Sequence, residues 1–222
     1  MKYLSMICLF FLALGGVASA ETLSGSDNSN YAQLNLGSGI SGNSRLEIAG
    51  TNIGSYSENF RPKPGVFTSG AVGHSYSNGM AAEVEVLYSR NDIKTDRLNA
   101  LLGVNSNASA QTYGAMINGM YAISKIHGFV PYVGAGVGYG VAKYEALGGA
   151  LKDNDSGVMW QLRAGASYPI SPTAAFVIEY RYLDAPQYKL RGAFTFNGVQ
   201  QTGVASAHTA LHVLSLGMRY RF

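Results

Sequence analysis

Charged residues are scarce in this sequence. Only 13% of its 222 residues are Asp, Glu, Lys or Arg, whereas soluble domains carry about 25%. The hydrophobic share of 47% is too high for a disordered chain. The 28 glycines, without Ala-, Glu-, Lys- and Leu-rich heptads, exclude a coiled coil. The net charge of +3 gives no indication of nucleic-acid binding.

Cysteine is almost absent, and the one cysteine, Cys8, lies in a segment that we expect to be removed. A short positive start is followed by the apolar run 3–17 and by Ala18-Ser19-Ala20, which is an A-x-A cleavage pattern. This predicts a secretory signal peptide over 1–20 and a single domain over 21–222. An N-terminal membrane anchor is the alternative, and the small and polar residues that end the segment argue against it. The cleaved chain would have no disulfide and no thiol chemistry.

No apolar run long enough for a transmembrane helix follows the signal segment. Apolar and polar residues alternate instead. Val84 and Val86 alternate with Glu83, Glu85 and Leu87, and the same rhythm recurs near the C-terminus. Side chains of a strand point alternately to opposite faces, so this pattern predicts strands with one apolar and one polar face.

A glycine-rich run at 129–144 follows the same rule. Its apolar residues share one parity, and its glycines at 134, 136, 138 and 140 share the other. A nucleotide-binding loop would need the spacing G-x-G-x-x-G before a helix, and neither is present. The run therefore predicts a strand whose inner face must stay small.

Eight such strands can be delimited, and the connections between them alternate between short and long. The expected strands are 31–40, 66–76, 80–90, 111–123, 129–144, 157–168, 174–183 and 208–222. The long polar connections are 41–65, 91–110, 145–156 and 184–207. This layout is typical of an outer-membrane barrel with short periplasmic turns and long external loops. The prediction is an all-β fold, namely a closed antiparallel eight-stranded transmembrane β-barrel with four long external loops and both termini in the periplasm.

A soluble β-sandwich would alternate as well. It would not need an apolar outer face with aromatic residues at the strand ends, such as Tyr76, Tyr88 and Trp160. Aromatic rings prefer the boundary between water and lipid, and backbone groups in lipid must be paired within the protein. The aromatic ends therefore favour the closed barrel.

The motifs resemble those of small bacterial outer-membrane barrels of the OmpA, OmpX and opacity-protein type. The C-terminal LGMRYRF (216–222) is similar to the terminal strand of such proteins, which the barrel-assembly machinery recognises. The resemblance implies that Met218, Tyr220 and Phe222 form this assembly signal. GAVGHSY (70–76) and PYVGAGVG (131–138) look like strands of the surface-antigen family of alphaproteobacteria.

The interior of the barrel is a candidate site, because an eight-stranded barrel is just wide enough for side chains to fill. Gln161 and a set of charged residues share the inward parity, and buried charges must pair. We expect a charge network in the lumen of Glu83, Glu85, Arg163, Glu179, Arg181, Arg219 and Arg221. Two interpretations remain: a polar plug that stiffens the barrel, and a narrow ion path in a small porin.

Catalysis has little support in the sequence. His74-Ser75 is the only local His/Ser cluster, and it lies at the expected periplasmic end without an orienting carboxylate. His208 and His212 share one parity, but two ligands are too few for a metal site. We therefore expect neither an enzyme, a bound metal nor a cofactor.

The loops are the main candidate for function, because loops on a rigid scaffold commonly carry binding. They contain basic residues such as Arg45, Lys63 and Lys94, which would contact lipopolysaccharide phosphates in the outer-membrane lipid. The sequence predicts a surface protein of the bacterial outer membrane with a structural, antigen-like or adhesin-like role and a host ligand at its loops. A small porin is the alternative.

Overall fold

The computed structural model describes residues 28–41, 44–50, 54–60, 63–93, 108–146, 151–185, 188–196, 199–207 and 210–222. The expected signal peptide, Cys8 and His208 lie outside these residues. Twelve β-strands make up the regular structure of the described part. Among these residues no helix has the length and apolar character needed to cross a membrane.

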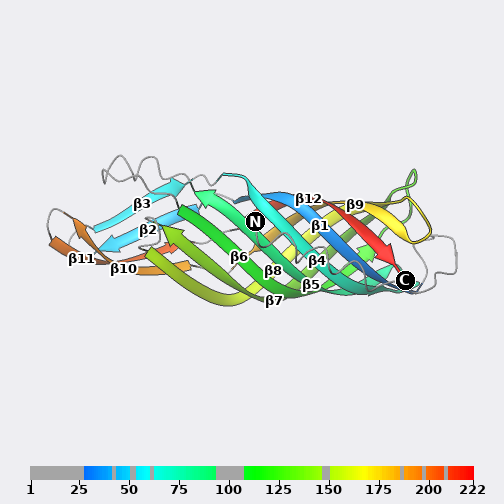
Figure 1. The fold of residues 1–222 in the computed structure, drawn as a ribbon, viewed down its shortest axis with the longest axis horizontal. Coiled ribbons are helices and arrows are strands. Elements are labelled where there is room, and N and C mark those ends of the chain that lie inside the picture. The colour runs from blue at the N-terminus through cyan, green and yellow to red at the C-terminus, as the bar shows by residue number, and fades with distance from the viewer. Residues whose placement is uncertain are drawn as a thin grey trace, which may run out of the picture.

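Eight of the strands form a closed antiparallel barrel, which confirms the predicted fold class (Figure 1). Their order around the barrel is β1-β12-β9-β8-β7-β6-β5-β4. The bounds are β1 Ser29–Ser41, β4 Gly65–Ser75, β5 Met80–Ile93, β6 Ala108–Ala122, β7 Val130–Ala146, β8 Leu151–Pro169, β9 Ala174–Asp184 and β12 Ala210–Arg221.

The first and last strands close the barrel. β1 and β12 pair from Tyr31 with Arg221 to Ser41 with Leu211, and the Phe222 N–H donates to the Asn30 carbonyl at 3.0 Å. Every strand of the ring therefore has two hydrogen-bonded neighbours, as a barrel in lipid requires.

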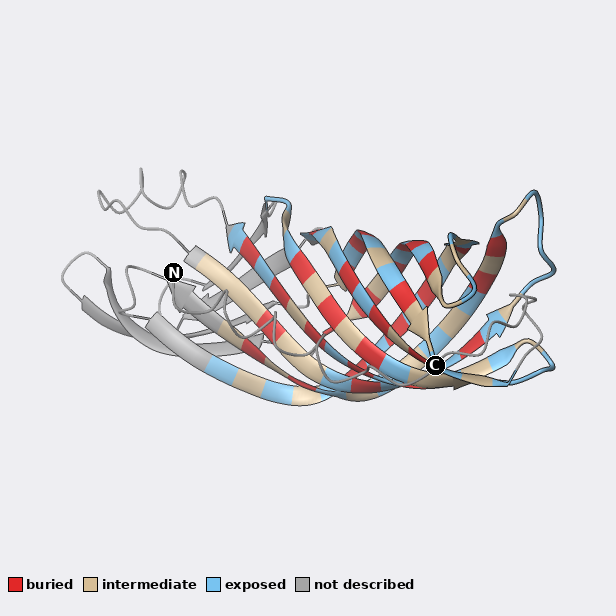
Figure 2. Ribbon diagram, turned by 45° about the vertical axis from the view of Figure 1, so that its right-hand side comes forward, coloured by how far each residue is buried: buried red, intermediate tan, exposed pale blue. Residues whose placement is uncertain are grey.

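The predicted alternation of faces is confirmed throughout the barrel. On β9, Val177, Glu179, Arg181 and Leu183 are buried, whereas Phe176, Ile178 and Tyr180 are exposed. Figure 2 shows this as alternating colours along the strands. The outward residues are large and apolar, with Leu216 at 66% and Val158 at 68% exposed. The barrel thus has a hydrophobic outer surface and a filled interior.

The three predicted short turns lie at one end of the barrel, which we call the short-turn end. Gly79, with φ of +82°, occupies the turn between β4 and β5, where a side chain would be strained. The turns between β6 and β7 and between β8 and β9 lie at 123–129 and 170–173. The C-terminus joins this end, since the Arg221 N–H donates to the Thr173 carbonyl at 2.7 Å.

The opposite end differs from the prediction, because its long connections contain strands. β2 (Ser44–Gly50), β3 (Gly54–Phe60), β10 (Tyr188–Phe196) and β11 (Val199–Ala207) form a second sheet in the order β10-β11-β2-β3. Figure 1 shows this sheet beyond the end of the barrel that is far from the C-terminus. We call it the outer sheet.

The predicted loop 145–156 is also mostly strand. β7 and β8 continue pairing as far as Ala146 with Leu151. Hydrophobic alternation marks a strand only where one face is apolar, so a strand segment without an apolar face lacks this signal.

Candidate functional site in the barrel interior

Glycines on β7 provide the space for the interior side chains. A β-carbon on Gly136 would collide with the Asn118 side-chain oxygen, and one on Gly140 would collide with the Met159 sulfur. These glycines share the inward parity that the sequence predicted. They allow β6 and β8 to place larger groups in the lumen.

A cluster of charged side chains fills the middle of the lumen. We call it the charge belt, and its members are Glu83, Glu85, Arg163, Glu179 and Arg181. Each of these side chains has 0% of its surface exposed. The residues come from β5, β8 and β9, where strand alternation turns each of them inward.

Arg163 bridges the acids of β5 and β9. Its Nη2 donates to Glu179 Oε2 at 2.6 Å and its Nε donates to the same oxygen at 2.9 Å. Its Nη1 donates to Glu83 and lies 3.6 Å from Glu85 Oε2. The planar guanidinium, with donors on two edges, suits this position between carboxylates.

Arg181 provides the second bridge. Its Nη2 lies 2.7 Å from Glu179 Oε1 and 2.8 Å from Glu85 Oε1, and its Nη1 donates to Gln161 Oε1 at 2.9 Å. Gln161 in turn donates to Glu85 at 2.8 Å and to the Asn118 oxygen at 2.6 Å. The amides of Gln161 and Asn118 therefore satisfy Glu85 Oε2, and the Tyr31 hydroxyl donates to Glu83 Oε2. Glu85 Oε1 and Arg181 Nε have no hydrogen-bond partner among the described residues, although Arg181 Nη2 forms an ion pair with Glu85 Oε1.

The other two predicted interior charges lie apart from the charge belt. Arg219 is buried and donates from Nε to Gln33 at 2.8 Å. Its guanidinium lies 4.4 Å from the Tyr31 ring centroid and 5.7 Å from that of Tyr132. Arg221 is half-buried and lies near the end of β12. The sequence placed both on the inward face but could not show how far they lie from the belt along the barrel.

An apolar layer, which the alternation of the sequence does not reveal, covers the charge belt on the side away from the short-turn end. It consists of buried side chains that contact one another: Phe67, Leu87, Met116, Met159, Leu183, Leu211 and Val213. The Arg181 guanidinium lies 4.7 Å from the Phe67 ring centroid, so the charge belt and the apolar layer are in direct contact there. The sequence predicted a polar interior throughout. The structure shows instead a polar belt with an apolar layer beside it.

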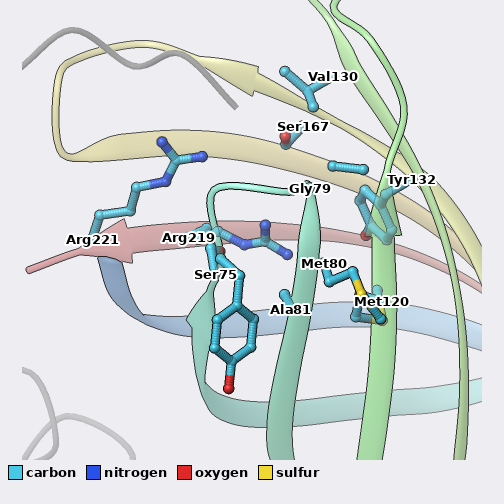
Figure 3. A pocket seen from close by; sticks show the side chains of 12 residues that line it. Ser75, Gly79, Met80, Ala81, Met120, Val130, Tyr132, Ser167, Arg219 and Arg221 are labelled. Carbon is cyan, nitrogen blue, oxygen red and sulfur yellow. The ribbon is translucent and has the colours of Figure 1, made fainter. Parts of the chain in front are cut away.

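A small cavity lies below the belt at the short-turn end (Figure 3). It has about 30 Å³ of free space, which is enough for one or two water molecules. Its walls include Arg219, Arg221, Tyr132, Met80 and Met120. The packed layers thus separate this cavity from the outer sheet.

The histidines form no catalytic arrangement in the described part of the chain. His74 Nδ1 lies 2.8 Å from Asn30 Oδ1, and His212 Nδ1 lies 2.7 Å from the Tyr180 hydroxyl on the outer surface. Among the residues that the structure describes, no group of His, Cys, Asp and Glu has the arrangement of a metal site.

Of the residues expected to form the assembly signal, Met218 and Tyr220 lie on the outward face of β12, and Phe222 follows directly after that strand. Met218 is 46% exposed and Phe222 is 49% exposed, while Tyr220 is half-buried. Their strand pairs with both β9 and β1. The predicted loop cations Arg45 and Lys94 have side chains outside the described part, and Lys63 is exposed.

Comparison with known proteins agrees with this architecture. The family model described as "Outer membrane protein beta-barrel domain" matches residues 9–222. The outer membrane protein OprG from Pseudomonas aeruginosa is similar in structure, with 13% identity, a TM-score of 0.61, and coverage of 89% of this chain and 98% of that one. No curated protein matches the sequence.

Two further solved structures align over most of the chain with lower scores. Neisserial surface protein A has 18% identity and a TM-score of 0.47, with 91% of this chain and 100% of that chain covered. Ail, the attachment invasion locus protein of Yersinia pestis, has 14% identity and a TM-score of 0.45, with 87% and 99% covered. At such identities the likeness concerns the fold alone.

Proposed function

Because this chain belongs to the outer membrane protein β-barrel domain family, and so to the bacterial outer membrane, we propose that it is a closed surface protein. In this proposal the barrel anchors the outer sheet at the cell surface, and the outer sheet with its loops carries the function. The role would be structural, antigen-like or adhesin-like, as the sequence predicted. The ligand would be a component of the host surface, and the basic loop residues would contact lipopolysaccharide.

One observation carries the proposal: the lumen is filled. The charge belt is buried and fully ion-paired, and the apolar layer packs directly against it through Phe67 and Arg181. An ion would have to separate buried pairs and then enter an apolar layer, where desolvation of a charge is costly. If the lumen is closed in this way, the outer sheet and the loops are the parts of the protein that can bind other molecules.

A small porin is the competing function. It would need the charge belt to open and the apolar layer to separate. The purified protein should give no channel events in planar lipid bilayers, at protein concentrations at which a known porin conducts. Regular, ion-selective current steps would contradict the closed barrel.

The proposed orientation places the outer sheet outside the cell and both termini in the periplasm. The expected signal peptide and the short turns support it. The one cysteine, Cys8, lies in the expected signal peptide, so single cysteines at Ser57 in β3 and at Ser171 in the turn after β8 allow a direct test. A membrane-impermeant maleimide should label S57C on intact cells and S171C only after the outer membrane is opened. The reverse pattern would invert the orientation.

The surface role itself is tested by removing the outer sheet. A variant in which short turns replace 45–59 and 189–206 keeps the eight barrel strands. Cells that display the full protein should attach to immobilised extracellular-matrix proteins more strongly than cells that display equal amounts of the trimmed barrel. Equal attachment by both would contradict an adhesin-like role. We propose no enzymatic activity, because no catalytic arrangement of the described residues supports one.

A further inference from the structure

The cavity at the short-turn end contains a nearly buried cation without an acidic partner. Arg219 is 9% exposed, and no Asp or Glu of the described residues lies within ion-pair distance of it. Its one hydrogen bond to the described part of the chain runs from Nε to Gln33. Both Nη groups are therefore without a protein acceptor among the residues that the structure describes.

Two tyrosines hold this guanidinium in place. Their rings lie 4.4 Å and 5.7 Å from it, and their hydroxyls donate elsewhere, from Tyr31 to Glu83 at 2.8 Å and from Tyr132 to Glu179 at 2.7 Å. Contacts with ring faces stabilise the cation and leave the N–H groups at the guanidinium edge available. The two rings fix the position of the Arg219 guanidinium, but they accept no hydrogen bond from its Nη groups.

The surroundings of the fork suit a small anion. Figure 3 shows Arg219 and Arg221 on β12 beside the cavity, and Met80, Met120 and Tyr132 on β5, β6 and β7, which do not pair with β12. Ser75 and Ser167 add hydroxyl groups to the wall. A guanidinium fork binds carboxylate and phosphate oxygens in pairs.

We propose that this cavity is an oxyanion site for the carboxylate or phosphate group of a small water-soluble molecule. The Nη groups of Arg219 bind two oxygens of the anion, and Arg221 adds a second positive charge. The Nη atoms of Arg219 are not among the described buried polar atoms that lack a partner, so they reach the solvent of the cavity, where an anion can approach them. The inference does not depend on the role of the outer sheet.

An alternative origin of the arrangement is charge balance within the lumen. The belt contains three glutamates and two arginines, so Arg219 offsets its net charge at longer range. In that case the Nη groups bind no anion, and added acetate or phosphate has the same effect as chloride.

Arginine side-chain NMR of the ¹⁵N-labelled protein in neutral detergent micelles separates the two cases. Titration with sodium acetate or sodium phosphate, against sodium chloride of equal ionic strength, should shift the Arg219 Nε–H signal to saturation. The signal of Arg90, an exposed residue on β5, serves as the control and should not saturate. Equal shifts with chloride, or equal shifts at Arg90, would overturn the proposal.

Calorimetry with matched variants provides the second measurement. R219Q should weaken acetate and phosphate binding by at least about tenfold, because two charge-assisted hydrogen bonds are lost, while R90Q should leave binding unchanged. R221Q, at a half-buried position, should weaken binding less than R219Q and provides the test if R219Q does not fold. Unchanged binding in R221Q and R219Q would overturn the site.

The NMR experiment also distinguishes a soluble anion from a lipid headgroup. An Arg219 shift that appears only in phosphatidylglycerol bicelles, and that soluble anions do not produce, would identify a lipid headgroup and overturn the soluble ligand.

Discussion

Arg163 on β8 donates two hydrogen bonds to a single oxygen of Glu179 on β9, at 2.6 Å and 2.9 Å. The same oxygen accepts from the Tyr132 hydroxyl, and the other oxygen accepts from Arg181 at 2.7 Å. Glu179 therefore joins both arginines of the charge belt to a third strand. A buried carboxylate in this position determines how well the whole belt is satisfied.

Glu179→Gln should destabilise the barrel by about 3–5 kcal/mol, because it leaves two buried guanidinium groups short of an anion. Urea unfolding in detergent micelles, followed by the fluorescence of the single tryptophan, measures the change. Asp92→Asn is the control. It removes an exposed ion pair with Arg90 at 3.8 Å, and should cost less than about 1 kcal/mol. Equal effects of both variants would mean that the belt contributes no more than a surface pair.

Tyr132→Phe removes the hydroxyl that donates to Glu179 and keeps the ring beneath Arg219. We expect a loss of about 1.5–3 kcal/mol, as for other hydrogen bonds to charged groups. Tyr139→Phe is the matched control, because that hydroxyl contacts Ser156 on the exposed surface at 3.0 Å. The same urea titration compares them, and a Tyr139→Phe effect as large as that of Tyr132→Phe would contradict the assignment.

Gly136→Ala tests whether the glycines of β7 make room for the lumen side chains. The new methyl group would collide with the Asn118 oxygen, which also accepts from Gln161. Overpacking of this kind costs about 1–3 kcal/mol. Gly119→Ala on β6 should be nearly neutral, since nothing lies within 4 Å of the added carbon. If Gly136→Ala were as stable as Gly119→Ala, the small inner face would have no role in packing.

Phe222→Ala tests the proposed assembly signal. The ring is 49% exposed and contributes little to the core, so the variant should refold in detergent as the natural chain does. In cells, however, the share of folded protein in the outer membrane should fall severalfold if the assembly machinery reads this ring. Leu214→Ala removes an outward side chain that is 60% exposed on the same strand, and it should assemble normally. A similar loss in both variants would argue against a specific signal.

Much of the barrel was predictable because lipid on one side and a filled lumen on the other impose a two-residue period. Glu85 and Val86 show this, being 0% and 61% exposed. The period gives the face of each residue but not its height along the barrel axis. Leu87 and Val213 were both on the inward parity, yet only the register between strands shows that they meet Phe67 in one layer.

The outer sheet could not be predicted in the same way. Its central contact pairs Gly50 with Gly203 and Glu47 with Ser206, and these residues are far apart in the sequence. Long-range pairing of this kind leaves no local pattern, and a strand without one apolar face carries no hydrophobic alternation. The sequence also could not predict that the Nη groups of Arg219 lack an acceptor among the described residues. It shows which charged residues face inward, but not which of them form ion pairs.

The seam between β1 and β12 has a consequence for biogenesis. The two strands that complete the ring lie at opposite ends of the described part of the chain, so the ring stays open until β12 is in place. A chain that lacked only β12 would expose unpaired peptide groups of β1 and β9 to hydrocarbon, at a cost of several kcal/mol for each group. Closure of the barrel in lipid therefore requires strands from both ends of the described chain to meet.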